Sequence, residues 1–383
     1  MCGWGATFTF IQHGLGKRSA SVVFSFNNRL QKIKPKKDFV QCAPISLFFL
    51  DNNGNLKPIA IQLFQDPGLD NPIFTPLDPP NTWTFVKMWM NNADTLHHQA
   101  VSNLGGTHLT MEGIVVASHR NLAKSHPILK LLAPHFLYLV PVNTLAVPKL
   151  IDPGEFVDSI MNIGAEGLMV AVNRHLKVWR MDVHGDLPEF LKHRGLDDPN
   201  VLPGYYYRDD GLLVFEAIRD YVREYVEIYY TDADLIKGDT ELQSWIQDLV
   251  RPTDAPVPGC GIKGVAGNGE LTTTDQLVRI LTSIIWTSSG QHAASNFKQY
   301  EQYAFPPNCP LYLSGSPPKT KNAIVTDQNI LDSMPDRKQT LRIVNTSTQF
   351  EIKRTNPIGD FEVRVLNIVL YVCNSQWLCI LVI

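Results

Sequence analysis

The sequence has no excess of charge of either sign. Its 383 residues include 34 lysines and arginines and 37 aspartates and glutamates, which gives a formal net charge of -3 at pH 7. Binding to the phosphates of nucleic acid or to an anionic membrane is favoured by a clear excess of basic residues. The composition gives no electrostatic reason to expect either as the main partner. We therefore expect an uncharged or amphiphilic ligand and no nucleic acid.

Cysteine is sparse and scattered. The six cysteines form no CxxC pair and no dense framework of the kind that cross-links small secreted domains. The first residues, 1–16, are mixed and aromatic, and Gln12 and His13 stand where a signal peptide has an unbroken apolar run. These absences predict a protein of the reducing, cytoplasmic compartment.

Long uninterrupted apolar runs are absent as well. The segment from Val365 to Ile383 is very apolar, but Asn367 and the polar triplet NSQ at 374–376 interrupt it. A helix that crosses a bilayer needs about 20 consecutive, mainly apolar residues. We therefore expect no membrane span in this segment.

The sequence does contain enough apolar material for a large core, because 44% of its residues are hydrophobic. Residues 44–63 form two short apolar runs around Asn52-Asn53-Gly54, which is typical of a tight hairpin turn. The repeated prolines at 67–80 cannot continue a helix or a central strand, so we interpret them as a connector.

Three longer segments, 83–120, 210–230 and 274–303, have the apolar spacing of helices. Thr272 to Thr274 are candidate N-caps of the third segment. We find no internal repeat and no low-complexity segment. The sequence thus predicts a mainly α fold with small β elements near the N-terminus.

Four of the eleven histidines are candidates for a metal site, since imidazole binds iron, copper and zinc alike: His97, His98, His108 and His292. A zinc protease would need the pattern HExxH on one helix. The residues that follow His98, QAVSN, contain neither the glutamate nor the second histidine, which excludes this class. By residue type alone, a core or surface histidine without a metal is the commoner case.

Two separated segments carry a more specific pattern. Residues 83–113 read WTFVKMWMNNADTLHHQAVSNLGGTHLTMEG and are soon followed by RNLAKSHPILKLLAPH, while residues 288–300 read SSGQHAASNFKQY. In this order and spacing they resemble the catalytic domain of animal-type, non-haem iron lipoxygenases. The resemblance implies a lipoxygenase-type helical catalytic domain, incomplete, at residues 41–350. Residues 1–40 have no clear counterpart, and residues 351–383 form a divergent apolar tail.

The resemblance places the iron ligands on two long core helices. On the second helix the family has a histidine followed four residues later by a histidine or an asparagine, which matches His292 and Asn296. Residues four apart share a helical face. On the first helix the two ligand positions are five residues apart, at Asn103 and His108. In a regular α-helix, side chains five residues apart point in different directions. The match therefore predicts a π-bulge, and the two glycines between these positions, Gly105 and Gly106, are consistent with one.

Other positions follow from the same resemblance. Gln99 and Gln299 match glutamines whose hydrogen bonds orient the ligands. Asn103 departs from the family, since a carboxamide oxygen replaces an imidazole and is a weaker donor for a transition metal. The family completes the ligand set with the carboxylate of a C-terminal isoleucine. Ile383 is terminal, but its flank QWLCILV differs from the family's ending, so it is a candidate by position alone.

The function implied by the resemblance is that of a dioxygenase. One non-haem iron per chain and molecular oxygen would convert a polyunsaturated fatty acid with a cis,cis-1,4-pentadiene into a hydroperoxide. An alanine at position 146 implies a product of mainly S configuration. Ordinary core packing explains two of the matching pocket positions, Ile160 and Met161, equally well. The full set of positions that match the family's substrate pocket is Leu109, Ala146, Ile160 and Met161.

Two other classes stay open at this stage. A lipoxygenase-like pseudoenzyme or lipid-binding protein would keep the pocket but hold iron poorly, and Asn103 and the altered tail favour it. A chain without the family's final helix would instead expose part of its core and fold poorly. Peripheral contact with a membrane is compatible with a lipid ligand, and the oligomeric state is open.

Overall fold

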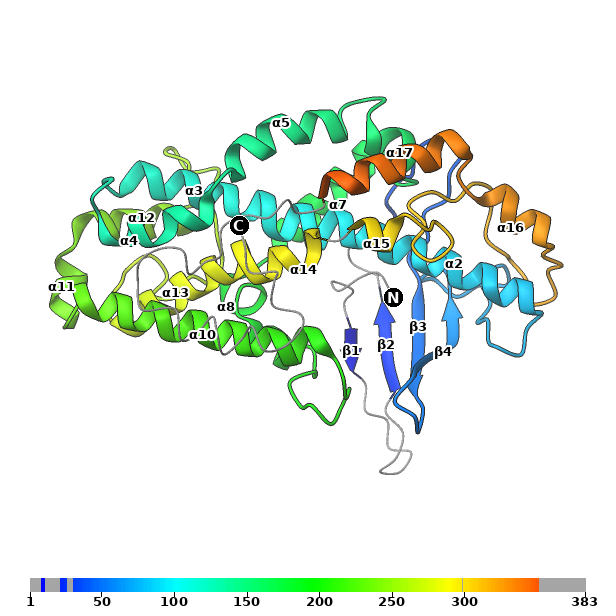
Figure 1. The fold of residues 1–383 in the computed structure, drawn as a ribbon, viewed down its shortest axis with the longest axis horizontal. Coiled ribbons are helices and arrows are strands. Elements are labelled where there is room, and N and C mark those ends of the chain that lie inside the picture. The colour runs from blue at the N-terminus through cyan, green and yellow to red at the C-terminus, as the bar shows by residue number, and fades with distance from the viewer. Residues whose placement is uncertain (1–7, 11–20, 26–29, 298, 351–383) are drawn as a thin grey trace.

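A four-stranded antiparallel sheet stands beside the helical body in the computed structural model (Figure 1), which describes residues 8–10, 21–25, 30–297 and 299–350. The hairpin between its third and fourth strands is where the sequence predicts it. The Asp51 carboxylate accepts hydrogen bonds from the backbone N–H groups of Asn53 and Asn55, and Gly54 adopts a φ of 78° that favours glycine. In chain order the strands are β1 (Phe8–Phe10), β2 (Ser21–Ser25), β3 (Ile45–Leu50) and β4 (Leu56–Gln62).

One nearly continuous helical rod runs through the centre of the molecule (Figure 1). It consists of α2 (Pro80–His97), a π-helix η1 (His98–Leu109) and α3 (Thr110–Asn121). The rod begins three residues before the predicted start at residue 83, because Pro80 occupies the first helical turn, where its missing N–H costs nothing.

A second rod lies against the first. It consists of α13 (Thr274–Trp286), the π-helix η3 (Thr287–Gln291), α14 (His292–Asn296) and, after a break, α15 (Gln299–Tyr303). The Thr273 side chain accepts from the backbone of Gln276, whose own side chain bonds back to the cap. This capping box confirms the predicted start of the helix.

The remaining helices surround the two rods. α10 (Tyr206–Tyr229) packs along α13, and α12 (Thr240–Val250) packs along α3. The helices α5 (Leu139–Ile151) and α7 (Gly164–Val178) pack on η1, and the short helix α6 (Phe156–Ile160) packs against both of them. The shorter elements are α4 (Pro127–Leu132), η2 (Ala133–Phe136), α8 (Met181–His184), α9 (Leu187–His193), α11 (Ala233–Gly238), α16 (Asp327–Ser333), α17 (Arg337–Ser347) and η4 (Thr348–Phe350). The predicted mainly α fold with β elements near the N-terminus is confirmed.

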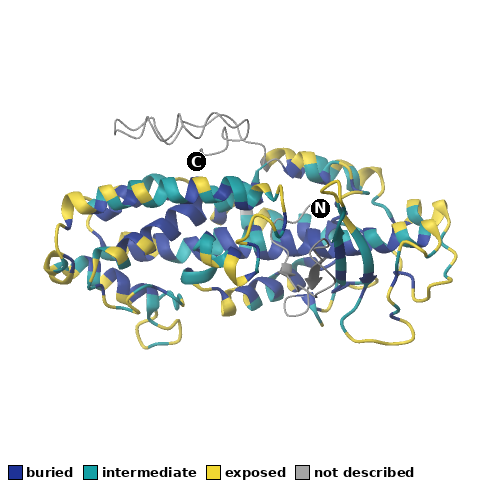
Figure 2. Ribbon diagram, turned by 90° about the horizontal axis from the view of Figure 1, so that it is seen from below, coloured by how far each residue is buried: buried dark blue, intermediate teal, exposed yellow. Residues whose placement is uncertain are grey.

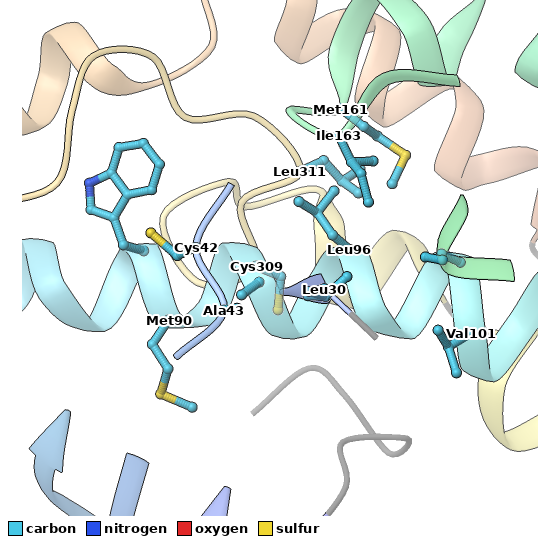
Figure 3. Packing of buried hydrophobic residues seen from close by; sticks show 14 of the residues in the cluster. Leu30, Cys42, Ala43, Met90, Leu96, Val101, Met161, Ile163, Cys309 and Leu311 are labelled. Atoms are coloured by element: carbon cyan, nitrogen blue, oxygen red, sulfur yellow. The ribbon is translucent and has the colours of Figure 1, made fainter. Parts of the chain in front are cut away.

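Buried apolar side chains form two clusters, and Figure 2 shows them concentrated along the central helices. The first cluster joins α2 to the sheet, to α7 and to residues 309–313. Figure 3 shows Leu30, Leu96 and Leu311 of this cluster packed around the α2 helix. The second cluster joins α3, α12 and α13. Because close-packed interiors resist deformation, both rods present their side chains at fixed positions.

One stretch within the described residues, Pro127–Leu145, is long and apolar enough to cross a membrane by length and composition alone. One third of it is buried inside the protein. The stretch joins α4, η2 and the first half of α5, and Tyr138 between η2 and α5 has a φ of 62°. The chain therefore turns within it. The apolar segment from Val365 to Ile383 lies outside the described residues.

Candidate metal centre

Asn103 and His108 lie on η1, whose backbone hydrogen bonds run from residue i to residue i+5. Side chains five residues apart therefore point to nearly the same side, and the predicted π-bulge is confirmed. Close packing requires glycine at position 106. A Cβ there would lie 2.9 Å from the carbonyl oxygen of Val101 and 3.3 Å from Nε2 of His175 on α7.

His108 meets His292, the first residue of α14. Their Nε2 atoms are 3.0 Å apart, and their ring planes are inclined by 77°. Burial lowers the pKa of both imidazoles, and the neighbouring His108 lowers the pKa of His292 further. Both rings are therefore neutral at pH 7, which is the form in which imidazole binds a metal.

The other ring nitrogen of His108 has its own partner. Its Nδ1 lies 3.1 Å from Oδ1 of Asn143 on α5, and the amide nitrogen of Asn143 donates to the carboxylate of Glu112 at 2.7 Å. Because an amide oxygen only accepts hydrogen bonds, Nδ1 of His108 carries the proton. Its Nε2 therefore presents a lone pair toward His292.

The distance between the two Nε2 atoms suits two ligands of one ion. Imidazole nitrogens bind metals such as zinc at about 2.1 Å, so two of them at right angles around one ion lie about 3.0 Å apart. In the absence of an ion, the Nε2–H of His292 can donate to the lone pair on Nε2 of His108 at this distance. When both Nε2 atoms are unprotonated, the same separation fits two ligands of one iron ion, for which imidazole is suitable.

Two buried carboxamides extend this donor set. Asn103 and Asn296 are 5% and 7% exposed, and the Oδ1 atom of each makes no hydrogen bond within the described part of the chain. Buried polar atoms normally have partners, so these two oxygens suit a cation. The Asn296 side chain also lies beside His108, where it opposes the lowering of the His108 pKa by burial. Among the described residues no group of three or more His, Cys, Asp or Glu could hold a metal, so the site depends on the carboxamides.

Ile383, the terminal candidate ligand, lies outside the described residues. The structure thus brings together His108 and His292, and places Asn296 beside His108. Asn103 lines the same cavity as His108 and Asn296. The roles of these residues as ligands of iron stay predictions.

Two cross-links join the rods beside this centre. Nε2 of Gln99 donates to Oε1 of Gln299 at 2.8 Å, and Nδ1 of His98 lies 2.5 Å from the hydroxyl oxygen of Tyr303. Burial lowers the pKa of His98 to about 4, so this ring is neutral too. Both links connect η1, which carries His108, to α15, which follows the helix that begins with His292.

An apolar cavity of about 90 Å³ adjoins the centre. Asn103, His108 and Asn296 form part of its wall, and apolar side chains of α5, α6, α7 and the loops beside them form most of the rest. The helix α17 adds the hydroxyl side chains of Thr346 and Ser347. No aspartate, glutamate, lysine or arginine of the described chain lines it. Such a wall suits an alkyl chain rather than a charged ligand.

The four pocket positions matched from sequence differ in their surroundings. Met161 lines the cavity, whereas Leu109 and Ile160 pack in the first core cluster and do not line it. Leu104, also on η1, takes a place in the wall. The side chain of Ala146 lies outside what the structure describes, but Val147 beside it on α5 lines the cavity.

Three residues around the centre have no counterpart among the sequence predictions: Glu112, Asn143 and Tyr303. The sequence signal for Asn143 is its polar amide three residues before Ala146 in the segment VNTLAV, because residues three apart lie on one side of a helix. In the structure this amide contacts His108.

Known proteins resemble the chain over most of its length. A family model described as lipoxygenase matches residues 25–352. The allene oxide synthase-lipoxygenase protein of Plexaura homomalla is 40% identical over 306 residues, which cover 79% of this chain and 28% of that protein. The human polyunsaturated fatty acid lipoxygenase ALOX15B is 35% identical over 303 residues, which cover 79% of this chain and 43% of that protein.

Solved structures show the same fold. A calcium-dependent 11R-lipoxygenase superposes with a TM-score of 0.85 at 31% identity, over 92% of this chain and 54% of that chain. A lipoxygenase variant in complex with arachidonate superposes with a TM-score of 0.83 at 33% identity, also over 92% of this chain and 54% of that chain. This chain thus spans about half, or less, of the relatives that it matches. It belongs to the lipoxygenase family, is of the animal type, and covers part of the catalytic domain of its relatives.

Proposed function

We propose that the chain is a dioxygenase that inserts molecular oxygen into a polyunsaturated fatty acid with the help of one non-haem iron. The observation that carries this proposal is the contact between the neutral rings of His108 and His292, beside a cavity without charged side chains. The names of its relatives, which are polyunsaturated fatty acid lipoxygenases, and the arachidonate complex of a related structure support the choice of substrate class.

The residues that would hold iron are His108, His292, Asn296 and Asn103. When bound, the iron supplies the one-electron oxidation that removes a hydrogen atom from the methylene between two cis double bonds. The overall reaction balances, because the methylene loses one hydrogen atom, one O2 molecule bonds to an end carbon of the pentadiene, and a hydrogen atom returns as the O–H of the hydroperoxide.

The chain's own residues contribute position and environment. The hydrogen bond from His108 to Asn143 keeps the proton on Nδ1 and so keeps Nε2 free to bind a metal. The apolar side chains of α5, α6 and α7 exclude water and hold the alkyl chain near this point. Pockets for whole ligands usually measure about 300 to 1,000 Å³, so a wall of the cavity of about 90 Å³ must move to admit a fatty acid.

A second candidate function is lipid binding without turnover. Asn103 favours it, since its carboxamide oxygen stands where the resemblance places an imidazole and binds a transition metal less strongly. The buried centre and the apolar cavity would serve such a protein equally well.

Oxygen uptake decides between the two candidates. The purified chain is loaded with ferrous iron without air, its iron is quantified, and oxygen consumption is followed with linoleate or arachidonate. The dioxygenase predicts uptake that is lost in His108→Ala and kept in His119→Ala, which removes an exposed histidine of α3. Fatty acid binding by an iron-loaded chain that consumes no oxygen would favour the second candidate and reject the first.

A further inference from the structure

The outward side of α5 is apolar. Tyr138, Val142 and Leu145 are 67%, 43% and 66% exposed, and they stand at positions i, i+4 and i+7. Val142 and Leu145 lie three apart on α5 and so share one side of the helix, and Tyr138 is the residue directly before its first turn, with a φ of 62°. The same side continues to Lys149, also exposed, at i+11. We name Tyr138, Val142, Leu145 and Lys149 the α5 outer stripe. Figure 1 shows α5 along an edge of the molecule.

The opposite side of α5 faces the cavity. Asn143, Val147, Leu150 and Ile151 line it, and Asn143 contacts His108. Val142 lines the cavity as well, although it is 43% exposed. The helix α5 alone therefore separates the cavity from this part of the surface, and Val142 contributes both to the cavity wall and to the exposed surface.

The stretch that ends with α5 is rich in basic residues. From Gly113 to Ile151 there is no aspartate or glutamate, and the segment has four basic residues, Arg120, Lys124, Lys130 and Lys149, whereas the acidic residues Glu112 and Asp152 lie directly outside its two ends. Since the whole chain has a net charge of -3, the remainder carries -3 minus 4, that is -7. Arg120 is paired with Asp248. The three lysines are exposed, and no ion pair of theirs occurs among the described residues.

A lipid surface with anionic headgroups matches these features together. Apolar stripes with an aromatic residue and flanking lysines lie in the interface of a bilayer, and each lysine near an anionic surface contributes about 1 kcal/mol. A protein partner with complementary acidic groups would not explain why the stripe stands beside a cavity for an alkyl chain. Fatty acids partition into bilayers, so a chain docked there can take its substrate without passing it through water.

We propose that the α5 outer stripe docks on an anionic membrane and opens the cavity toward it at Val142. This inference deepens the proposed function, because it rests on a lipid substrate. It assigns to α5 both the support of His108 and the contact with the membrane.

Vesicle binding tests the proposal without iron or turnover, so its failure is distinct from a failure of the dioxygenase. The chain is mixed with phosphatidylcholine vesicles with or without phosphatidylserine, and the bound fraction is measured by flotation. The parent should bind the phosphatidylserine vesicles more tightly. Leu145→Asp should weaken this binding about tenfold or more, because the variant has no leucine side chain to transfer from water into the bilayer. Lys149→Gln should weaken it about fivefold with phosphatidylserine and little without it.

Matched changes elsewhere serve as controls. Leu213→Asp on α10 alters a leucine that is 60% exposed, and Lys192→Gln on α9 alters a lysine that is 68% exposed. Both should bind vesicles like the parent, and thermal melts should show that all four variants fold. Equal binding by Leu145→Asp and Leu213→Asp, or no binding by the parent, would overturn the proposal. So would a parent dimer that Leu145→Asp dissociates in sedimentation, because the stripe would then join two copies of the chain.

Discussion

Nδ1 of His108 lies 3.1 Å from Oδ1 of Asn143, although 35 residues separate them in the chain. Asn143 is held in turn, since its amide nitrogen donates to Glu112 and to the carbonyl oxygen of His108. The asparagine therefore determines which nitrogen of His108 carries the proton and how the ring is turned. Its helix, α5, also forms a wall of the cavity.

Asn143→Ala should weaken iron binding about 10- to 100-fold, the usual effect of removing a group that orients a metal ligand. Competition with a chelator measures the affinity. Thr144→Ala is the control, because Thr144 is the exposed neighbour on the same helix. An unchanged affinity in Asn143→Ala would show that His108 needs no support from α5.

Asn103→His should tighten iron binding and raise oxygen uptake. The change replaces a weak carboxamide donor by an imidazole, and the cavity beside Asn103 gives the larger ring space. Iron content under identical loading measures the effect. A variant that holds no more iron than the parent would show that Asn103 is not at the metal.

Gly106→Ala should destabilise the fold by about 1 to 3 kcal/mol, since its Cβ would lie 2.9 Å from the Val101 carbonyl oxygen of η1 and 3.3 Å from Nε2 of His175 on α7. Gly238→Ala, where no atom lies within 4 Å of the added Cβ, should instead stabilise by about 0.4 to 1 kcal/mol. Chemical denaturation gives both values. Similar effects at the two positions would contradict the tight packing of η1 against α7.

Stability should fall as the pH falls from 6.5 toward 4. Burial lowers the pKa of His98 to about 4 from its ordinary value of 6.5, so the unfolded chain binds this proton first. Between pH 6.5 and pH 4, titration of the His98 imidazole lowers the free energy of unfolding by at most about 1.4 kcal/mol per pH unit. His98→Gln should reduce the slope of unfolding free energy against pH, whereas His119→Gln, at an exposed position, should not. Equal slopes in the two variants would show that His98 is accessible to protons in the folded chain.

Local patterns predicted the local features of this chain. The hairpin at Asn52-Asn53-Gly54 and the cap at Thr273 depend on residues close in sequence. The π-bulge between Asn103 and His108 followed from the spacing of the two ligand positions that the resemblance assigns. The contacts of His98 with Tyr303 and of His108 with Asn143 depend on how distant helices pack, which spacing does not reveal. The same holds for the cavity wall, because whether Leu104 or Leu109 faces it follows from the winding of the π-helix.

The most direct test of the account is the amount of iron bound per chain after anaerobic loading with ferrous iron, compared between the parent and His292→Ala. His119→Ala is the control, since it also removes one histidine but from the surface. We expect one iron per chain in the parent and in His119→Ala, and none in His292→Ala. Equal iron in the parent and in His292→Ala, or none in the parent, would contradict it.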